Sequence, residues 1–245
     1  MIYMKYARLC MALIDAFFKV WFRFPRLSRN DRLRAIQSWS ARVLTILRIE
    51  VQATTPPIEH APHALWVANH VSWLDILVIL SLQPCIFVAK REVKHWPLVG
   101  ALAQACGVIF VDRSSASAAK EMVKDVAAAL QRGYCVAGFP EGTSSDGLQV
   151  QLFHANLFEA ALLMDTPVQP IALRYVHAHN HTLCTQAAFI GELGFLASLH
   201  QVVEQKNVIA KVKLEKRLPP AGHSRRTLAH LSHQYVSHAL ATMAH

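Results

Sequence analysis

A histidine and an aspartate five positions apart, His70 and Asp75, are the first residues in the chain that could do chemistry together. They lie between an expected strand over residues 64–68 and an expected helix over residues 74–82. Strand ends in α/β sheets are where sites form, and a carboxylate in the first turn of a helix can hold one ring nitrogen of a preceding histidine. The other nitrogen can then take a proton from a substrate hydroxyl. The alternative is that Ser72 and Asp75 only cap the helix and His70 is an ordinary turn residue.

A second segment, Phe-Pro-Glu-Gly-Thr over residues 139–143, follows another expected strand. Gly142 permits a close backbone approach, and amides exposed at such a turn can hold a phosphate or a developing oxyanion. Packing explains poorly why a glutamate, Glu141, stands between a proline and a glycine. The alternative is a tight turn with a solvated glutamate and a helix capped by Ser or Thr.

Two basic features lie at other expected strand ends. Arg113 follows a strand predicted over residues 108–111, where its guanidinium could bind a phosphate or a carboxylate. Lys90, with Arg91 and Lys94, forms a basic cluster that could contact an anionic head group or an acyl carrier. The plainer alternatives are an exposed strand-end arginine and a solvated loop.

The elements that must position these residues alternate along the chain. Strands are predicted over 64–68, 86–89, 108–111, 134–139, 168–174, 187–190 and 208–215, and helices over 74–82, 116–131, 153–164, 195–205 and 227–243. This alternation predicts an α/β domain over residues 49–245, with a mixed central sheet flanked by helices.

Residues 1–48 have a different character. Two amphipathic helices are predicted, over 4–24 and 28–47, and the segment holds ten Lys or Arg against two Asp, which accounts for +8 of the formal net charge of +9. Aromatic residues lie among these charges, a composition that favours a lipid interface over nucleic acid. We therefore expect a membrane-surface helical hairpin on a peripheral or monotopic protein. The alternative is a hairpin that packs on the protein with a solvated basic face.

Composition limits the other classes of protein. No apolar stretch reaches the roughly 18 residues that a membrane-spanning helix needs. The five cysteines form no Cys-x-x-Cys pair, which predicts neither a disulfide framework nor a zinc site and favours the reducing cytosol, hence the cytoplasmic face of the cell membrane. The segment His177-Ala-His-Asn-His181 could ligate a metal but has no neighbouring carboxylate or cysteine, so a solvated loop is favoured. No serine-hydrolase elbow, P-loop or dinucleotide fingerprint is present.

Taken in order, these motifs resemble those of the glycerolipid acyltransferase family, which includes the 1-acylglycerol-3-phosphate acyltransferases. The resemblance covers about residues 60 to 175. The family's His-x-x-x-x-Asp motif is matched by His70 and Asp75, its second motif by residues 110–113, its Phe-Pro-Glu-Gly-Thr motif by residues 139–143, and its later hydrophobic-proline motif by residues 168–170. One such match is weak evidence, but four in order with ordinary spacing are specific.

The resemblance implies an enzyme that transfers a fatty acyl group from acyl-CoA or acyl carrier protein to the free hydroxyl of a lysophospholipid. The first-choice acceptor is 1-acyl-sn-glycerol-3-phosphate (lysophosphatidic acid), which gives phosphatidic acid. The resemblance also implies direct transfer without an acyl-enzyme, a metal or another cofactor. His70 would deprotonate the acceptor hydroxyl and Asp75 would orient His70. The implied substrate-binding residues are Arg113, Lys90, Glu141, Gly142 and Thr143.

The chain departs from the family pattern at one position. The third motif usually continues with Arg then Ser, whereas this chain has Ser144 and Ser145. A missing guanidinium removes a charge-assisted contact to a phosphate, so lyso-ornithine lipid is the alternative acceptor. A lipid hydrolase or transacylase using the same base, and a non-catalytic membrane module, are the other classes, and the intact histidine, aspartate and glutamate argue against the last.

Overall fold

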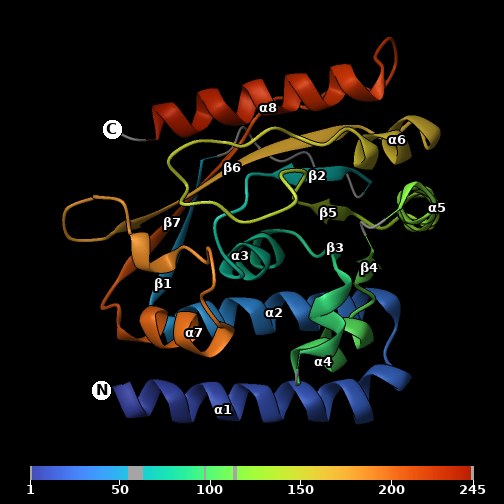
Figure 1. Ribbon diagram of the computed structural model, residues 1–245. Helices are drawn as coiled ribbons and strands as arrows, with labels where there is room; N and C mark the ends of the chain where they lie inside the picture. The colour runs from blue at the N-terminus through green and yellow to red at the C-terminus, as the bar shows by residue number, and fades with distance from the viewer. Residues whose placement is uncertain (1, 55–62, 97, 113–114, 244–245) are drawn as a thin grey trace.

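The computed structural model describes residues 2–54, 63–96, 98–112 and 115–243 (Figure 1). These residues contain one seven-stranded sheet, in the order β1-β7-β6-β2-β5-β3-β4. The strands are β1 (Ile49–Thr54), β2 (Leu65–Ala68), β3 (Ile86–Lys90), β4 (Ile109–Val111), β5 (Val136–Gly138), β6 (Val168–His177) and β7 (Val208–Leu214). The α-helices are α1 (Ile2–Phe18), α2 (Arg29–Leu47), α3 (Leu74–Leu82), α4 (Val99–Ala105), α5 (Ala116–Gln131), α6 (Asn156–Leu163), α7 (Phe195–Glu204) and α8 (Arg225–Thr242). The predicted mixed α/β sheet is confirmed.

The strands that precede the candidate residues are parallel to one another. β2 lies between β5 and β6 and is parallel to both, and β3 is parallel to β5 and β4. β7 is antiparallel to β6, which makes the sheet mixed. The carboxyl ends of β2, β3, β4 and β5 therefore meet at one edge of the sheet, where the polar segments that follow them come together.

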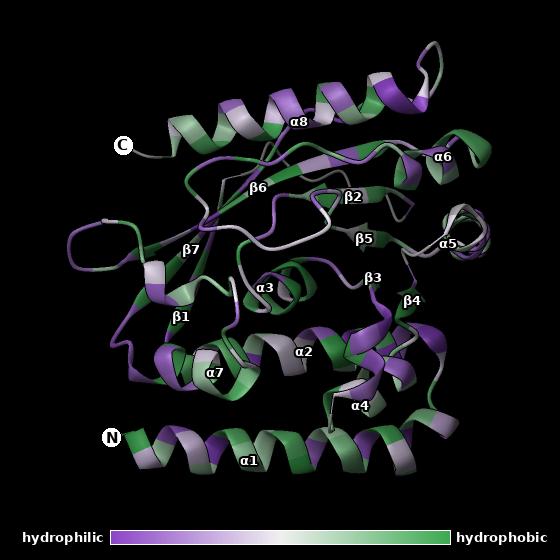
Figure 2. Cartoon of the chain, in the orientation of Figure 1, coloured by the Kyte–Doolittle hydropathy of each residue, from purple (hydrophilic) through white to green (hydrophobic). Residues whose placement is uncertain are grey.

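Helices cover both faces of the sheet, with α6 and α8 on one side and α2, α3 and α7 on the other (Figure 1). Strand β2 is buried on both faces: Trp66 packs in a core with α2 and α3, while Leu65 packs in a second core with α5 and α6. Such double burial is why β2 is continuously apolar rather than alternating. Helix α3, in the middle of the molecule, is hydrophobic along most of its length (Figure 2).

The N-terminal helices form a layer beneath the sheet, with α1 outermost (Figure 1). Ser28 caps α2 by accepting a 3.2 Å hydrogen bond from the Asp31 amide, as expected for a helix that begins after this serine. Val43, Leu44 and Leu47 of α2 are buried in the core shared with the sheet. None of the helices in the described residues is long and apolar enough to cross a bilayer.

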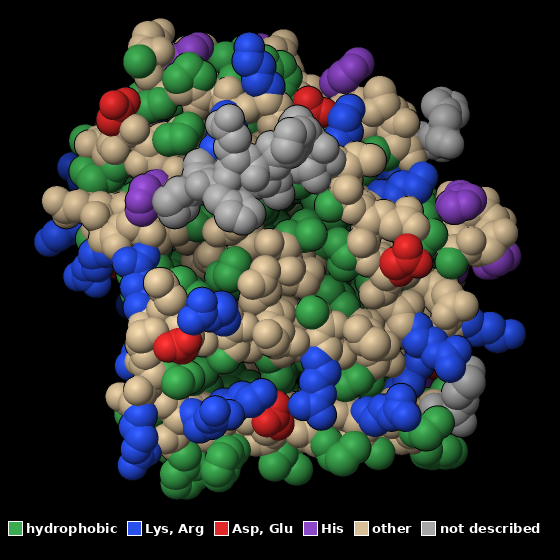
Figure 3. Space-filling model, turned by 180° about the vertical axis from the view of Figure 1, so that it is seen from behind, with side chains coloured by type: hydrophobic (Ala, Val, Ile, Leu, Met, Phe, Trp, Pro, Cys, Tyr) green, Lys and Arg blue, Asp and Glu red, His purple; other side chains and the backbone are tan. Residues whose placement is uncertain are grey.

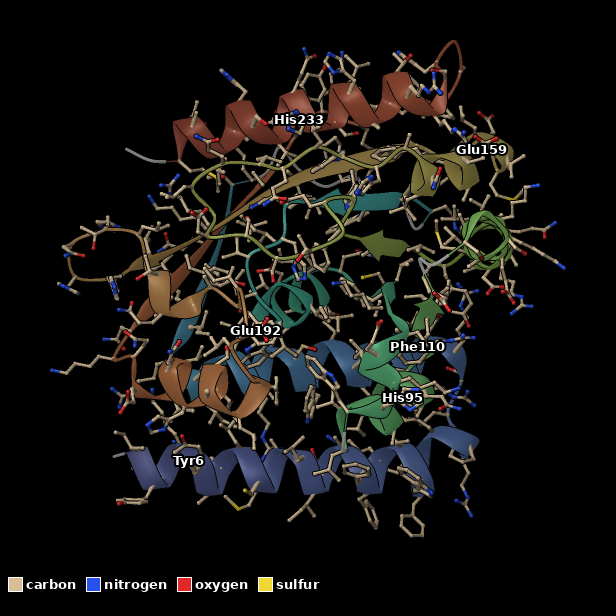
Figure 4. All side chains as sticks on the ribbon, in the orientation of Figure 1. Tyr6, His95, Phe110, Glu159, Glu192 and His233 are labelled. Atoms are coloured by element: carbon tan, nitrogen blue, oxygen red, sulfur yellow. The ribbon has the colours of Figure 1, made fainter. Side chains whose placement is uncertain are left out.

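Lys5 joins α1 to two other helices. Its amine is buried and donates to the carbonyl oxygens of Leu47 (3.3 Å), Val203 (2.8 Å) and Gln205 (2.7 Å), at the C-terminal ends of α2 and α7. A cation is favourable at a helix C-terminus because the unpaired carbonyls there carry partial negative charge. Tyr6 lies on the side of α1 that faces α7 (Figure 4), where its hydroxyl is 2.6 Å from Nδ1 of His200.

Three parts of the expected pattern were wrong. Residues 187–190 do not form a strand: Thr185–Ala187 is a 3₁₀ turn, and Ala188 is buried in the core without pairing. Strand β1 was not predicted, because it is an edge strand exposed over most of its length and carries no apolar pattern. Helix α4 was also missed, because its seven residues are too few for helical periodicity to be visible.

Candidate active site

His70 and Asp75 are in contact at the carboxyl end of β2. Nδ1 of His70 lies 2.8 Å from Oδ2 of Asp75, and since an ionised carboxylate only accepts hydrogen bonds, Nδ1 is the protonated nitrogen. The Asp75 side chain is fully buried, whereas that of His70 is 21% exposed. Within the described residues, Nε2 of His70 has no hydrogen-bond partner. The ring therefore presents an unprotonated nitrogen toward solvent, as a general base requires.

The same carboxylate also holds the turn that precedes helix α3. Oδ2 of Asp75 accepts from the backbone amides of Val71 (2.7 Å) and Ser72 (2.9 Å), and the hydroxyl of Tyr175 donates to Oδ1 at 2.7 Å. Four donors thus satisfy one buried carboxylate, as a buried charge requires. The alternative of a Ser72–Asp75 helix cap is not borne out, because no side chain caps the start of α3 and the Ser72 hydroxyl has no hydrogen-bond partner among the described residues.

Asn69, the residue before His70, is fixed to β6. Its side-chain amide donates to the carbonyl oxygen of Leu173 at 3.0 Å, and its carbonyl oxygen accepts from the Leu173 amide at 2.8 Å. Asn69 is 1% exposed, so this pair of hydrogen bonds is shielded from water. These hydrogen bonds therefore fix the turn that carries His70 to strand β6.

Glu141 reaches the same turn because of the strand register. Val67 of β2 pairs with Gly138 of β5. Three residues beyond this pair, His70 and Glu141 therefore lie side by side. Oε1 of Glu141 accepts from the His70 amide at 2.9 Å, while Oε2 is buried and has no hydrogen-bond partner among the described residues. Burial raises the pKa of Glu141 to about 7, opposed by the amides of His70 and Gln151 and reinforced by the charge of Asp75.

The turn after Glu141 is hydrogen-bonded to the turn that holds His70. Gly142 has φ +79, which favours glycine, and its amide donates to the carbonyl oxygen of Phe139 at 3.1 Å. The amide of Ser145 donates to the carbonyl oxygen of His70 at 2.8 Å. Phe139 stacks on the His70 ring with centroids 4.0 Å apart.

The amides of Thr143 and Ser144 have no hydrogen-bond partner among the described residues.

The Ser144 hydroxyl donates its hydrogen bond to the carbonyl oxygen of Phe189. It therefore does not donate to a bound anion in this structure. Lys90 is exposed at the end of β3. The neighbouring Arg91 lies 3.2 Å from a carboxylate oxygen of Asp112, beyond β4. Arg113 lies outside the described residues, so its predicted role has no structural description.

An aromatic cluster at the start of α3 was not predicted from the sequence. Trp73, three residues after His70, donates from its indole to the Ser198 hydroxyl of α7 at 3.0 Å and packs edge-on against Phe195, 5.3 Å between centroids. Trp96 packs 5.3 Å from Phe195 and thereby joins the segment before α4 to α7. These aromatic residues connect the start of α3 and the segment before α4 to helix α7.

Comparison with known proteins agrees with this geometry. The sequence profile of a protein family described as Acyltransferase matches residues 48–174 of this chain, the part that holds His70, Asp75 and Glu141. The chain belongs to this acyltransferase family. The family resemblance drawn from the motifs is thereby confirmed.

Individual relatives cover most of the acyltransferase chain. A lyso-ornithine lipid O-acyltransferase of Pseudomonas aeruginosa is 35% identical over 211 residues, which span 85% of this chain and 79% of that one. A 1-acyl-sn-glycerol-3-phosphate acyltransferase of Neisseria gonorrhoeae is 34% identical over 183 residues, 75% of this chain and 71% of that one. The crystal structure of the 1-acyl-sn-glycerophosphate acyltransferase of Thermotoga maritima has the same fold, with a TM-score of 0.66 at 20% identity over 98% of this chain and 97% of that one.

Proposed function

We propose that this acyltransferase moves a fatty acyl group from the thioester of acyl-CoA or acyl carrier protein to the free hydroxyl of a lysophospholipid. The observation that carries the proposal is the contact between His70 Nδ1 and the buried Asp75 carboxylate, which leaves Nε2 available as a base. The acceptor is 1-acyl-sn-glycerol-3-phosphate, and the product is phosphatidic acid.

The reaction proceeds by direct transfer. Nε2 of His70 takes the proton of the acceptor hydroxyl, whose oxygen attacks the thioester carbonyl carbon. The tetrahedral intermediate then expels the thiolate as the carbon–sulfur bond breaks, and the imidazolium returns the proton to sulfur. Asp75 stabilises the imidazolium in the meantime.

Backbone amides of the turn after Glu141 stabilise the oxyanion in this proposal. The Gly142 amide is already bonded to Phe139, which favours the amides of Thr143 and Ser144 for this task, with Gly142 supplying the turn. The unpartnered Oε2 of Glu141 can accept a hydrogen bond from a second hydroxyl or from another donor of the acceptor. Arg113 and Lys90 bind the anionic groups.

A second acceptor, lyso-ornithine lipid, is favoured by Ser144. This position lacks the usual arginine, and the Ser144 hydroxyl is bonded to the Phe189 carbonyl oxygen rather than held open for a phosphate. The Pseudomonas aeruginosa relative carries the lyso-ornithine name. A head group with a carboxylate and an ammonium needs no added guanidinium at this position.

We also propose that the enzyme works from the cytoplasmic membrane surface, bound through the outer face of α1. Large apolar side chains stay exposed along this helix and the short π-helix that follows it (Lys19–Arg23): Tyr3, Met4, Met11, Ile14, Phe18, Trp21 and Phe22. Figure 3 shows hydrophobic side chains along the lower edge of the molecule, where α1 lies, with Lys and Arg side chains above them. An apolar face bordered by basic residues suits an anionic bilayer.

A side-by-side transfer assay tests the proposal. Purified enzyme receives labelled acyl-CoA with lysophosphatidic acid, with lyso-ornithine lipid, or with no acceptor, and the products are resolved. We expect esterified lysophosphatidic acid, and a loss of about 10² to 10⁴-fold in His70→Ala. Release of free fatty acid with every acceptor identifies a hydrolase instead.

The variant Ser144→Arg separates the two acceptors. If lysophosphatidic acid is the substrate, an added guanidinium preserves or improves its use. If lyso-ornithine lipid is the substrate, the new cation faces the ornithine ammonium and reduces its use. A wild-type enzyme inactive on lysophosphatidic acid and active on lyso-ornithine lipid replaces the first acceptor by the second and leaves the chemistry unchanged.

A further inference from the structure

Tyr175 is tied to the catalytic pair although it lies far from it in sequence. It belongs to β6, its side chain is 1% exposed, and its hydroxyl donates to Oδ1 of Asp75 at 2.7 Å. Burial, together with the charge of Asp75, raises the pKa of Tyr175, so the phenol remains protonated and acts as a donor. Because Oδ2 carries the other three hydrogen bonds of Asp75, Tyr175 is the side-chain donor to Oδ1.

Strand β6 holds the catalytic turn at two points. Asn69, next to the base, is bonded twice to the backbone of Leu173, and two residues further along the same strand Tyr175 holds Asp75. The two anchors fix the ends of the segment from residue 69 to residue 75 on one rigid element. Loss of the Tyr175 hydroxyl leaves the Asn69 anchor intact, so the effect of the second anchor can be measured alone.

We infer that Tyr175 is a positioning residue that fixes the Asp75 carboxylate and thereby sets the orientation and proton affinity of His70. A hydrogen bond to a carboxylate withdraws negative charge from it. Without the phenol, Asp75 becomes more basic and holds the imidazolium more tightly, so the His70–Asp75 pair binds its proton more strongly. The other titratable groups that interact with the pair or with Tyr175 are Glu141 and Cys184.

The inference rests on the proposed transfer reaction, and Tyr175→Phe tests it with lysophosphatidic acid and labelled acyl-CoA. A hydrogen bond to a charged group corresponds to about one pKa unit or more, so the acid limb of kcat should move up by about one unit. On the acid limb, below the midpoints of both proteins, kcat should fall by about tenfold, with the KM of both substrates nearly unchanged. On the plateau above the acid limb of both proteins, most of the activity should return.

A merely structural role predicts a different profile. Damaged packing lowers kcat by the same factor at every pH, and that outcome overturns the inference. Tyr235→Phe, which removes the hydroxyl of a half-buried tyrosine on α8, is the matched control and should leave the pH profile of kcat unchanged.

A double-mutant cycle adds a second criterion. In the Asp75→Asn background, Tyr175→Phe should lower kcat little further, because it acts through Asp75. Additive losses contradict this.

The proton affinity can also be measured without turnover. Histidine ring signals are followed by NMR as pH is varied, and the His70 signal is assigned from its absence in His70→Ala. We expect the His70 titration to shift upward by about one unit in Tyr175→Phe. The ring signal reports the imidazole itself and not Glu141. A shift in a protein that fails to acylate any lysolipid keeps the positioning role and rejects the proposed reaction, whereas an unmoved signal rejects the positioning role.

Discussion

Two buried carboxylates lie beside His70 in opposite surroundings. Asp75 accepts four hydrogen bonds, including two from backbone amides and one from Tyr175. Glu141 accepts from the His70 amide through one oxygen, and its other oxygen is buried and unpartnered among the described residues. A carboxylate with many hydrogen-bond donors favours the anion, and a buried carboxylate with few donors favours the protonated form.

The raised pKa of Glu141 predicts how stability changes with pH. Its pKa rises from 4.5 in the unfolded chain to about 7 in the fold, because burial disfavours the anion. The folded state therefore binds the proton more tightly, and this contribution to stability is fully present below pH 4.5 and is lost as the pH rises to about 7. Urea unfolding at about pH 5 and about pH 8 should show the wild type losing on the order of 2 kcal/mol more than Glu141→Gln.

The glutamine keeps an oxygen for the His70 amide, so the comparison isolates the charge. All other ionisable groups are the same in both proteins, so their contributions cancel in the difference. Equal losses for the two proteins would show that the carboxyl is solvated at neutral pH.

At this scale the sequence revealed the groups that lie close together along the chain and missed those that do not. His70 and Asp75 fall within one turn, and Glu141 stands in a motif of its own, so each could be proposed from local pattern. Tyr175 and Asn69 carry no such signal: a tyrosine in an apolar strand is an ordinary core residue until the strand order places it against Asp75. The locked Gly142 amide is a property of the turn, which residue type alone does not reveal.

Helix α1 is attached to the molecule through specific contacts and not only through an apolar face. The Lys5 amine joins the ends of α2 and α7, and the Trp39 indole of α2 donates to the carbonyl oxygen of Ala12 at 2.8 Å. Burial lowers the pKa of Lys5 and the charge of Arg48 lowers it further. The amine is thus retained inside the protein because three carbonyls compensate it.

Replacing Lys5 by methionine should destabilise this attachment. Methionine keeps most of the apolar stem but leaves the carbonyls at two helix ends without their donor, at a cost of about 2 kcal/mol. The free energy of unfolding in urea measures it. Arg8→Met, which removes the same charge from an exposed position of α1, is the control and should change stability little. Equal effects of the two substitutions would mean that the loss of charge, and not the loss of the hydrogen bonds from Lys5 to the carbonyl oxygens, lowers the stability.

The elements that periodicity could predict are those with a strong apolar pattern. Helices α2, α3, α5, α7 and α8 and the inner strands were found close to their bounds. Strand β1 is held by pairing with β7, and its residues are mostly exposed, so hydrophobic pattern could not reveal it. The sequence does not reveal that α2 packs into the same core as the sheet, because amphipathic helices look alike whether they cover protein or lipid.

The whole molecule has one strongly apolar outer edge, and it can be tested by vesicle binding. Phe18 and Trp21 are each 56% exposed on α1 and the turn that follows it. The double variant Phe18→Glu, Trp21→Glu should bind anionic vesicles at least about 100-fold more weakly, since burying one such side chain contributes about 1.5–3 kcal/mol. Added salt should weaken wild-type binding as well.

Leu163→Glu is the matched control for this experiment. Leu163 is 57% exposed on α6, on the other side of the sheet from α1 (Figure 1). Circular dichroism checks that all variants are folded. If Leu163→Glu abolishes binding and the α1 variant does not, the lipid surface lies over α6 and the proposed orientation is wrong.

The N-terminal part of the chain contacts residues near its C-terminal end, and these contacts can form only late in folding. Lys5 binds carbonyls 198 and 200 residues later in the chain, and Ile49 at the start of β1 pairs with Val208 of β7. These contacts close very long loops, which makes the last step of folding slow and leaves early segments uncovered during synthesis. The ribosome releases α1 and α2 long before β7 exists, and a nearby bilayer is the apolar surface that can shelter their exposed faces in that interval. Chains made in solution without lipid should therefore aggregate more than chains made beside a membrane.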